Sequence, residues 1–512
     1  MKEFKSVIST VSMITFFSVI TRLFGFIFRV YLSRKLGAEG LGIYQVASSV
    51  MGIFMTLVAS GLPLVTAKMC ASFNHTKQFE QRNSCVTSST IIAIIISIVS
   101  SFGIIIFQPL LLKMFGSVVV ELLIIMCPAL IFSAVYAVFR GALWGKSSFF
   151  WVSFTEFIEQ VIRLILTFIM LYSVNNMLKA TIITAKSFSI TCFFSALIVA
   201  IIYFASGGKL KFEKKFYSSI IKSSTPITGV RIASSLIQPL TATLIPILLI
   251  KIGYTASQAM SEYGILMGMT FPLLFAPLSV VGSLSMVLVP KISTLKTCNE
   301  YEQIALNIEQ SLTGSLFLSM LLIPLFLSCG DLIGLVLFDN LQAGIYLQLS
   351  AVCILPIVLS NITSSILNAL SLEVKSFVNY LIGSIVMFVC LFVLTPIIHT
   401  SSIIVAFFVS MCLTTILNFR TIKKAVPSLS YKIMLSLFKY ALILLPSSLL
   451  GHFVSNILYK LLPAFISGLI GGGLSILSTL ILLQSFKVYP SAFATLKKFL
   501  HKHKSRSLKT NK

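Results

Sequence analysis

Charge is scarce in this chain of 512 residues, and acidic charge is the scarcest. Asp and Glu together number 14 against 39 Lys and Arg, and charged residues make up only 10% of the sequence. Hydrophobic residues make up 57%, and the mean hydropathy is +1.00. Soluble domains carry about 25% charged residues. The composition therefore excludes a soluble globular protein and indicates an integral membrane protein.

Motifs for enzyme chemistry are also absent from the sequence. There is no phosphate-binding loop, no HExxH and no CxxC pair. Five histidines are spread along the chain and form neither a metal-binding nor a catalytic pattern. We therefore expect a transporter rather than an enzyme, with no cofactor. Without a nucleotide site, transport must draw on an ion gradient, the membrane voltage or the substrate's own gradient.

The cysteines and the basic residues fit the same class of protein. The nine cysteines are scattered, mostly inside apolar runs, so we expect free thiols rather than disulfides. The net charge of +25 comes from short loops and a C-terminal tail that lack an aromatic stacking pattern, which argues against a nucleic-acid partner. These residues instead suit anionic lipid headgroups and set the topology.

Apolar runs long enough to cross a bilayer, about 20 residues each, recur along the whole chain. We expect the first run to be a retained helix rather than a signal peptide, because Arg22 interrupts it and no small-residue cleavage site follows. Gly37, Gly40 and Gly42 suit a tight outer turn after this helix. The fourteen predicted transmembrane helices cover residues 10–30, 43–67, 87–108, 118–140, 152–172, 183–205, 225–250, 263–289, 308–328, 345–370, 377–398, 401–419, 435–458 and 464–485.

The predicted fold is an all-α polytopic membrane protein made of two pseudo-symmetric six-helix bundles and a C-terminal helix pair. A faint repeat supports the symmetry, since Arg22 precedes Tyr44 much as Arg231 precedes Tyr263. The predicted domains are an N-terminal bundle (1–208), a cytoplasmic linker (209–224), a second bundle (225–425), two additional helices (426–490) and a basic cytoplasmic tail (491–512).

The distribution of basic residues predicts the orientation. With both termini in the cytoplasm, the inner loops and tails hold about 28 Lys or Arg and the outer loops about 7, as the positive-inside rule requires. Arg82 and Arg140 are assigned to inner loops on this basis. The protein is expected in the cytoplasmic membrane.

Four arginines lie inside predicted spans, where each costs about 2.5 to 3.5 kcal/mol on insertion scales and usually faces a bundle interior or a water-filled cavity. Arg22 and Arg29 are two helical turns apart and so share one face of the first span. Together with Arg231 of the seventh span, they would form a cationic site for an anionic substrate, because arginine donates paired hydrogen bonds to phosphate. The alternative is that Arg29 or Arg22 merely extends to the headgroups.

The fifth span contains the charged sequence "TEFIEQVIRL". Glu159 and Arg163 are four residues apart in the order that favours a helical ion pair, and Glu156 lies one turn earlier on the same side. Two interpretations stay open. The pair can be structural and neutralise its own buried charge, or a glutamate can be the site of a coupling ion, H⁺ or Na⁺. Only the second interpretation predicts a transport step that depends on pH or on the ion.

Two stretches carry a resemblance to a known family. Residues 21–45, "TRLFGFIFRVYLSRKLGAEGLGIYQ", and residues 140–165, "RGALWGKSSFFWVSFTEFIEQVIRLI", resemble helices of the stage V sporulation protein B family of polysaccharide and lipid-linked oligosaccharide exporters. The resemblance implies the multidrug/oligosaccharidyl-lipid/polysaccharide superfamily, in which two bundles rock about a central cavity. The related lipid II flippases have cavity arginines in their first helix. Arg22 resembles the first of these, Arg29 matches with the spacing shifted by one residue, and Val30 stands where those flippases have an acid.

Three hypotheses for function follow. The first is a flippase for an undecaprenyl-pyrophosphate-linked saccharide, most simply a lipid II-type peptidoglycan precursor, with spore cortex synthesis as the process that it would serve. Its partners would be that lipid-linked oligosaccharide, membrane lipids and a coupling ion, with the oligomeric state left open. The second is a cation-coupled multidrug exporter, which should have buried carboxylates without excess arginine. The third is a membrane scaffold, which would need neither Arg22 nor Arg231.

Overall fold

The computed structural model describes residues 2–276, 278–429 and 432–485 of the chain. These residues form helices joined by short turns, and no strand occurs among them. The prediction of an all-α protein is confirmed. The predicted basic tail at 491–512 lies outside the described residues.

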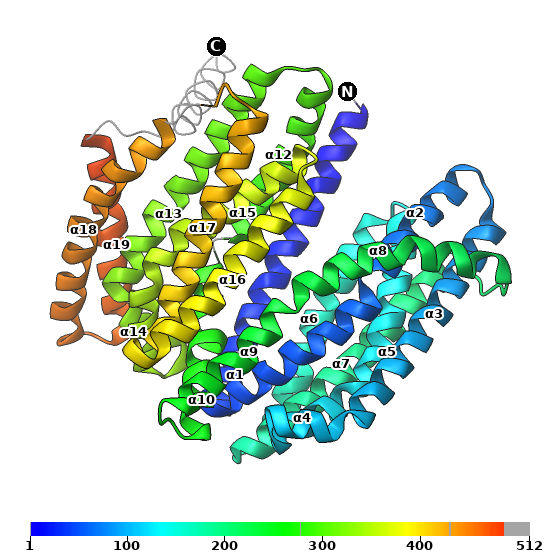
Figure 1. Ribbon diagram of the computed structural model, residues 1–512, viewed down its shortest axis with the longest axis horizontal. Coiled ribbons are helices and arrows are strands. Elements are labelled where there is room, and N and C mark those ends of the chain that lie inside the picture. The colour runs from blue at the N-terminus through cyan, green and yellow to red at the C-terminus, as the bar shows by residue number, and fades with distance from the viewer. Residues whose placement is uncertain (1, 277, 430–431, 486–512) are drawn as a thin grey trace, which may run out of the picture. The chain divides into compact units, whose positions relative to one another are not determined.

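The helices form two compact units, Met1–Gly268 (unit 1) and Met269–Lys512 (unit 2). Figure 1 labels the helices in chain order. Unit 1 contains α1 (Lys2–Ala59), α2 (Gly61–His75), α3 (Phe79–Ile106), α4 (Gln108–Phe115), α5 (Ser117–Gly145), α6 (Phe149–Leu171), α7 (Met177–Ala205), the 3-10 turn η1 (Lys214–Phe216), α8 (Tyr217–Ser235), α9 (Ile237–Lys251) and α10 (Ala256–Tyr263). The π-helical turn η2 (Gly264–Thr270) spans the boundary. Unit 2 contains α11 (Phe271–Phe275), α12 (Leu278–Thr297), α13 (Tyr301–Phe338), α14 (Leu341–Ser350), the 3-10 turn η3 (Ala351–Cys353), α15 (Ile354–Ala369), α16 (Glu373–Ile398), α17 (Ser401–Ala425), α18 (Lys432–Tyr459) and α19 (Ala464–Ser485).

Ten helical segments of the described chain are long and apolar enough to cross a membrane. The predicted number of fourteen stays a prediction, and two differences are instructive. Helix α6, predicted as the fifth span, holds three charged residues, which is too many for it to be counted among the ten apolar segments. The predicted eighth span, 263–289, is divided among η2, α11 and α12. The six-helix domains and the linker at 209–224 likewise stay predictions.

The first two predicted spans are joined through a sharp break at Gly37. Its φ of 66° lies in the left-handed region that glycine adopts without strain, so the expected turn is present there. Gly40 and Gly42, however, are helical, and their assignment to the turn was wrong. They serve close packing instead, since a Cβ on Gly40 would lie 2.8 Å from the Thr181 hydroxyl and one on Gly42 would collide with the backbone of Met260.

The core of unit 1 joins α2, α3, α5, α7 and α8. Phe139 of α5 stacks on Tyr203 of α7 with ring centroids 4.9 Å apart, and both side chains are buried. Thr66 of α2 donates a hydrogen bond of 2.9 Å to Ser89 of α3. All nine cysteines are free, as predicted, and most are buried. Helix α5 thus packs against both α2 and α7, which positions the site described below.

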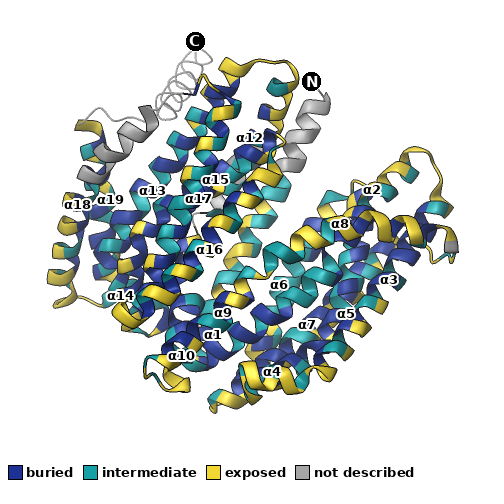
Figure 2. Cartoon of the chain, in the orientation of Figure 1, coloured by how far each residue is buried: buried dark blue, intermediate teal, exposed yellow. Residues whose placement is uncertain are grey.

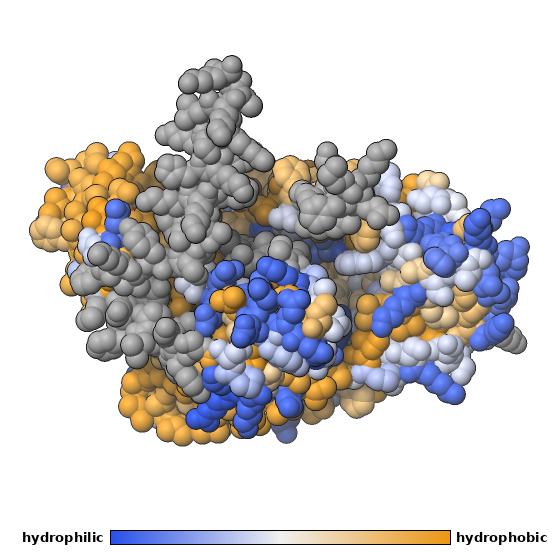
Figure 3. Space-filling view, turned by 90° about the horizontal axis from the view of Figure 1, so that it is seen from above, coloured by the Kyte–Doolittle hydropathy of each residue, from blue (hydrophilic) through white to orange (hydrophobic). Residues whose placement is uncertain are grey.

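In unit 2, α13 is the central helix and packs against α14, α15, α18 and α19. Large apolar side chains such as Leu445, Leu449 and Phe453 are exposed on α18. Figure 2 shows exposed residues along the outer sides of many helices, and Figure 3 shows clusters of hydrophilic residues beside areas of apolar residues on the face in view. Apolar sides and polar ends are the surface of a protein that spans a bilayer.

Candidate functional site

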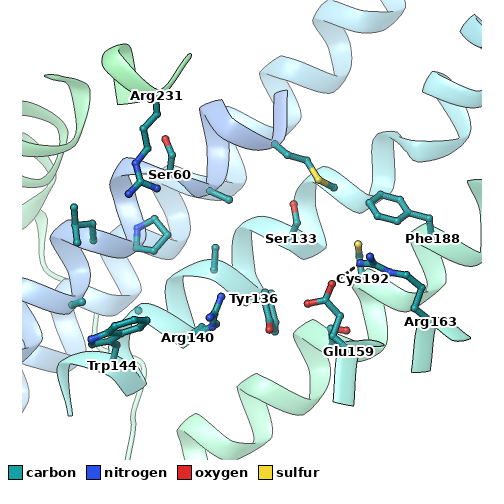
Figure 4. A pocket seen from close by; sticks show the side chains of 18 residues that line it. Ser60, Ser133, Tyr136, Arg140, Trp144, Glu159, Arg163, Phe188, Cys192 and Arg231 are labelled. Carbon is teal, nitrogen blue, oxygen red and sulfur yellow. Dashed lines mark hydrogen bonds and ion pairs between the residues drawn. The ribbon is translucent and has the colours of Figure 1, made fainter. Parts of the chain in front are cut away.

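A pocket of about 480 Å³ lies inside unit 1, bounded by α1, α2, α5, α6, α7 and α8. Its volume falls in the range of small-molecule sites. Most of its wall is apolar or weakly polar, and its charged lining residues are Arg140, Glu159, Arg163 and Arg231. Figure 4 shows Arg231 entering from one side, with Arg140, Tyr136 and the Glu159–Arg163 pair on the others. Three helices, α5, α6 and α8, thus bring charge to one cavity.

The Glu159–Arg163 pair predicted from the sequence is present. The Arg163 Nη2 donates to Glu159 Oε1 at 2.6 Å, and each side chain is only 20% exposed. The Arg163 guanidinium also lies 5.4 Å from the centroid of the Phe188 ring, on α7, which adds a cation–π contact. Both members line the pocket, so the pair belongs to its wall.

The ion pair of Arg140 with Glu156 was not predicted. The prediction that Arg140 lies in an inner loop was wrong, because α5 continues to Gly145. The extension follows from packing. A Cβ on Gly141 would lie 2.5 Å from the Pro63 carbonyl oxygen, and one on Gly145 would lie 2.5 Å from that of Ala67, so these glycines let the end of α5 pack on α2.

The pocket holds more guanidinium groups than carboxylates. Even with Glu156 counted, two carboxylates face three arginines. The Nε atoms of Arg140 and Arg163 are buried and have no hydrogen-bond acceptor among the described residues. Arg231 makes no ion pair or hydrogen bond within that part of the chain, and its side chain is exposed to the cavity. The Arg231 guanidinium, which is open to the cavity, can bind an anionic group through charge-assisted hydrogen bonds.

Arg82 shows what a structural arginine looks like in the same unit. It was predicted in an inner loop, but it lies in α3 and is buried. Its guanidinium donates to Asn74 Oδ1 at 3.0 Å and to the Gly207 carbonyl at 3.1 Å. Burial, together with the nearby Arg82 charge, lowers the pKa of the Lys146 amine, just beyond α5, to about 8. Arg82 is thus held by protein acceptors, unlike Arg231.

The first-helix arginines lie elsewhere on α1. Arg22 is exposed and Arg29 is partly buried, and neither is among the residues that line the pocket. The structure therefore brings Arg231 together with Arg163 and Glu159. The convergence of Arg22 and Arg29 with Arg231 stays a prediction.

We expect Glu159→Gln to lower the yield of folded protein. The change leaves the largely buried Arg163 guanidinium without a carboxylate partner. The free energy of unfolding should fall by about 1–3 kcal/mol, less than for a fully buried pair. Glu156→Gln is the matched control, because the Glu156 side chain is 42% exposed and its loss should cost less. The yield and the thermal unfolding of each variant in detergent measure these two effects. Normal folding of Glu159→Gln with loss of transport would instead favour the coupling-ion interpretation.

The apolar helices of the described chain define a multi-pass membrane protein, and its unit 1 holds a cationic pocket. The model of the polysaccharide biosynthesis protein family matches residues 7–296, which is more than half of the chain, and the chain belongs to this family.

Two curated relatives from Bacillus subtilis (strain 168) are similar over most of the sequence. Stage V sporulation protein B is 24% identical over 436 residues, covering 80% of this chain and 82% of the relative. Lipid II flippase MurJ is 22% identical over 496 residues, covering 89% of this chain and 88% of the relative.

Solved structures show the same fold. A lipid II flippase MurJ in an inward closed conformation superposes with a TM-score of 0.72 at 16% identity, covering 92% of this chain and 98% of that structure. An inward-facing multidrug resistance MATE family transporter of the MOP superfamily superposes with a TM-score of 0.63 at 13% identity, covering 80% and 95%. The resemblance seen in the sequence is confirmed, and the fold is that of the MOP superfamily.

Proposed function

We propose that the protein is a flippase that moves an undecaprenyl-pyrophosphate-linked saccharide from the inner to the outer leaflet by alternating access. The substrate we propose is a lipid II-type peptidoglycan precursor, and the process it serves is spore cortex synthesis. The names of the two Bacillus relatives support both parts of the proposal. Both termini are proposed to be cytoplasmic.

The pocket of unit 1 is the observation that carries this proposal. A pyrophosphate cannot cross hydrocarbon without replacement of its hydration shell. Arg231 supplies donors that are open to the cavity, and Arg140 and Arg163 add positive charge to its wall. The polyprenyl tail needs no such site, because it can stay in lipid throughout the reorientation of the headgroup. We propose that Arg22 and Arg29 guide the headgroup along α1.

The ion pairs lower the net positive charge of the pocket while no substrate is bound. Glu159 and Glu156 each neutralise one arginine while no substrate is bound. An incoming pyrophosphate would add anionic charge next to Arg231 and share the remaining donors of Arg140 and Arg163. We therefore assign the Glu159–Arg163 pair a structural role in the pocket wall.

A cation-coupled multidrug exporter is the second candidate, favoured by the similarity to the MATE transporter structure. The charge of the pocket argues against it. A lipophilic cation would have to bind where guanidinium groups outnumber carboxylates, at a cost in like-charge repulsion.

Ligand binding to the purified full-length chain tests the proposal. We expect undecaprenyl pyrophosphate to bind. Uncharged undecaprenol and a lipophilic cationic dye should each bind at least about tenfold more weakly, because one charge-assisted contact contributes about 1.5–3 kcal/mol. Native mass spectrometry or fluorescence titration gives the affinities. Tighter binding of the cationic dye would support the drug exporter and contradict the flippase.

A further inference from the structure

A second cavity, of about 450 Å³, adjoins the pocket of unit 1 and shares Arg231 with it. It lies between α1 and α8, close to the junction of α1 with α2. Arg231 is the one charged residue that lines it in the described chain, whereas the pocket holds three more charged residues. We call this second cavity the hydroxyl cavity, because its lining residues include Thr56, Ser60, Ser234 and Ser235. Two cavities of different chemistry thus meet at one arginine.

Close packing at the start of α2 brings Arg231 to this boundary. A Cβ on Gly61 would lie 2.6 Å from the Ser224 carbonyl oxygen, so glycine here lets α8 approach the junction of α1 with α2. Arg231 follows Ser224 by seven residues, which is about two helical turns, and both therefore lie on one face of α8. Figure 4 shows the Arg231 side chain beside Ser60, the residue that joins α1 to α2.

The hydroxyl groups of the second cavity are placed to accept hydrogen bonds from a ligand. The Thr56 hydroxyl donates to a carbonyl of its own helix at 2.8 Å, and the hydroxyls of Ser234 and Ser235 do so at 3.0 Å. A hydroxyl group has one hydrogen and two lone pairs, so each of these oxygens can still accept. An ionised diphosphate offers only acceptors and gains no donor from them. The hydroxyl and amide groups of a sugar are donors and suit them.

Ser60 is a polar residue that lines both cavities and makes no hydrogen bond of its own. Its side chain is 6% exposed, its Oγ has no partner among the described residues, and it does not cap α2. A buried hydroxyl without a partner is costly. A ligand that extends from one cavity into the other would pass beside Ser60 and supply that partner after a rotation about the Cα–Cβ bond.

We propose that the two cavities divide the headgroup of the substrate, with the diphosphate in the arginine-lined pocket and the adjoining sugar in the hydroxyl cavity. This inference rests on the flippase function proposed above. Arg231 holds the diphosphate at the boundary, and the sugar donates hydrogen bonds to the Thr56 and Ser234 oxygens. The volume of about 450 Å³ lies within the range of small-molecule sites. The hydroxyl cavity therefore makes the protein prefer a saccharide-bearing lipid to the bare diphosphate lipid.

The Trp144 ring offers a competing place for the sugar inside the pocket. Trp144 lines the pocket, is 54% exposed, and could carry a sugar ring on its aromatic face. It lies near the end of α5, with its ring edge-on to Phe149 at a centroid distance of 6.4 Å. Its neighbour in the pocket wall one turn earlier is Arg140, which suits the diphosphate instead. The hydroxyl cavity is thus the better match for an uncharged sugar.

Two lipids that differ only in the saccharide test the inference on the purified full-length chain. The probes are lipid II and undecaprenyl pyrophosphate, and native mass spectrometry gives their affinities. We expect Thr56→Val and Ser234→Ala each to weaken binding of lipid II about two- to tenfold and to leave binding of undecaprenyl pyrophosphate unchanged, because each removes one neutral hydrogen bond. Thr90→Val on α3 is the matched control, since the Thr90 hydroxyl also donates to its own helix at 2.8 Å but lines neither cavity. This control should change neither affinity.

The outcomes separate the inference from the function on which it rests. Equal losses for the two lipids in Thr56→Val and Ser234→Ala would overturn the inference and leave the flippase assignment intact. A selective loss of lipid II binding in Trp144→Leu, with none in the two hydroxyl variants, would place the sugar in the pocket and overturn it as well. Failure of the parent chain to bind either lipid would contradict the flippase itself, and the inference with it.

Photo-crosslinking locates the sugar without any substitution. A lipid II analogue with a diazirine on its saccharide is irradiated with the full-length chain in membrane vesicles, and fragment-ion mass spectrometry identifies the adducts. We expect adducts on α1 or α8, which enclose the hydroxyl cavity, and their loss in the presence of excess lipid II. Adducts on α6 or α7, which line the pocket but not the hydroxyl cavity, would overturn the proposed arrangement.

Discussion

Arg231→Ala should abolish transport while the protein still reaches the membrane in normal amounts. Arg231 projects into the pocket from α8 and makes no ion pair or hydrogen bond with the described residues, so its removal orphans no protein group. It should instead remove the guanidinium most available to the pyrophosphate. The lost contact should weaken binding of undecaprenyl pyrophosphate by about ten- to hundredfold.

Two further variants sharpen this prediction. Arg231→Lys keeps the charge but loses the planar pair of donors, so we expect partial activity. Lys222→Ala removes an exposed cation from the same helix outside the pocket and should have no effect. Complementation of a flippase-deficient strain measures activity, and immunoblotting of membranes measures expression. Full complementation by Arg231→Ala at normal expression would contradict the anionic-headgroup mechanism.

Gly42→Ala should prevent stable folding of unit 1. A Cβ on Gly42 would lie 3.0 Å from the Met260 carbonyl carbon and still closer to its oxygen, and both belong to the backbone of α10. The contact is reciprocal, because a Cβ on Gly264 would lie 2.8 Å from the Gly42 nitrogen. Backbone atoms cannot move aside as a flexible side chain can. We expect a loss of about 3 kcal/mol or more, at the upper end of overpacking effects.

Gly52→Ala is the matched control for Gly42→Ala. Gly52 lies on the same helix, and a Cβ there would meet no atom within 4 Å. Alanine favours helix over glycine by about 0.5–1 kcal/mol, so this variant should be as stable as the parent protein or slightly more so. Fluorescence-detected size-exclusion chromatography after heating gives the apparent unfolding temperature of each. Equal stability of the two variants would show that α1 and α10 do not approach as described.

The sequence was sufficient for features that depend on local spacing. Hydropathy predicted an all-helical membrane protein, and the four-residue spacing of Glu159 and Arg163 predicted their ion pair because both lie on one helix face. The break at Gly37 was also predictable, since a positive φ favours glycine. These features need no knowledge of which helices are neighbours.

Features that depend on tertiary packing were not predictable in the same way. Arg140 enters the pocket because Gly141 and Gly145 let α5 continue along α2, and this contact joins residues far apart in the sequence. Only a predicted fourth span that ran on to the turn at Lys146 would have placed Arg140 inside a helix.

The most direct test of the flippase assignment is the leaflet distribution of lipid II in a flippase-deficient strain that is kept alive by this protein. Externally added enzyme or label that reacts only with outer-leaflet lipid II is measured before and after depletion of the protein. The proposed function predicts that the accessible fraction falls on depletion while total lipid II rises, and that re-expression restores it. An accessible fraction that stays constant on depletion, or failure of the protein to sustain such a strain at normal expression, would contradict the account.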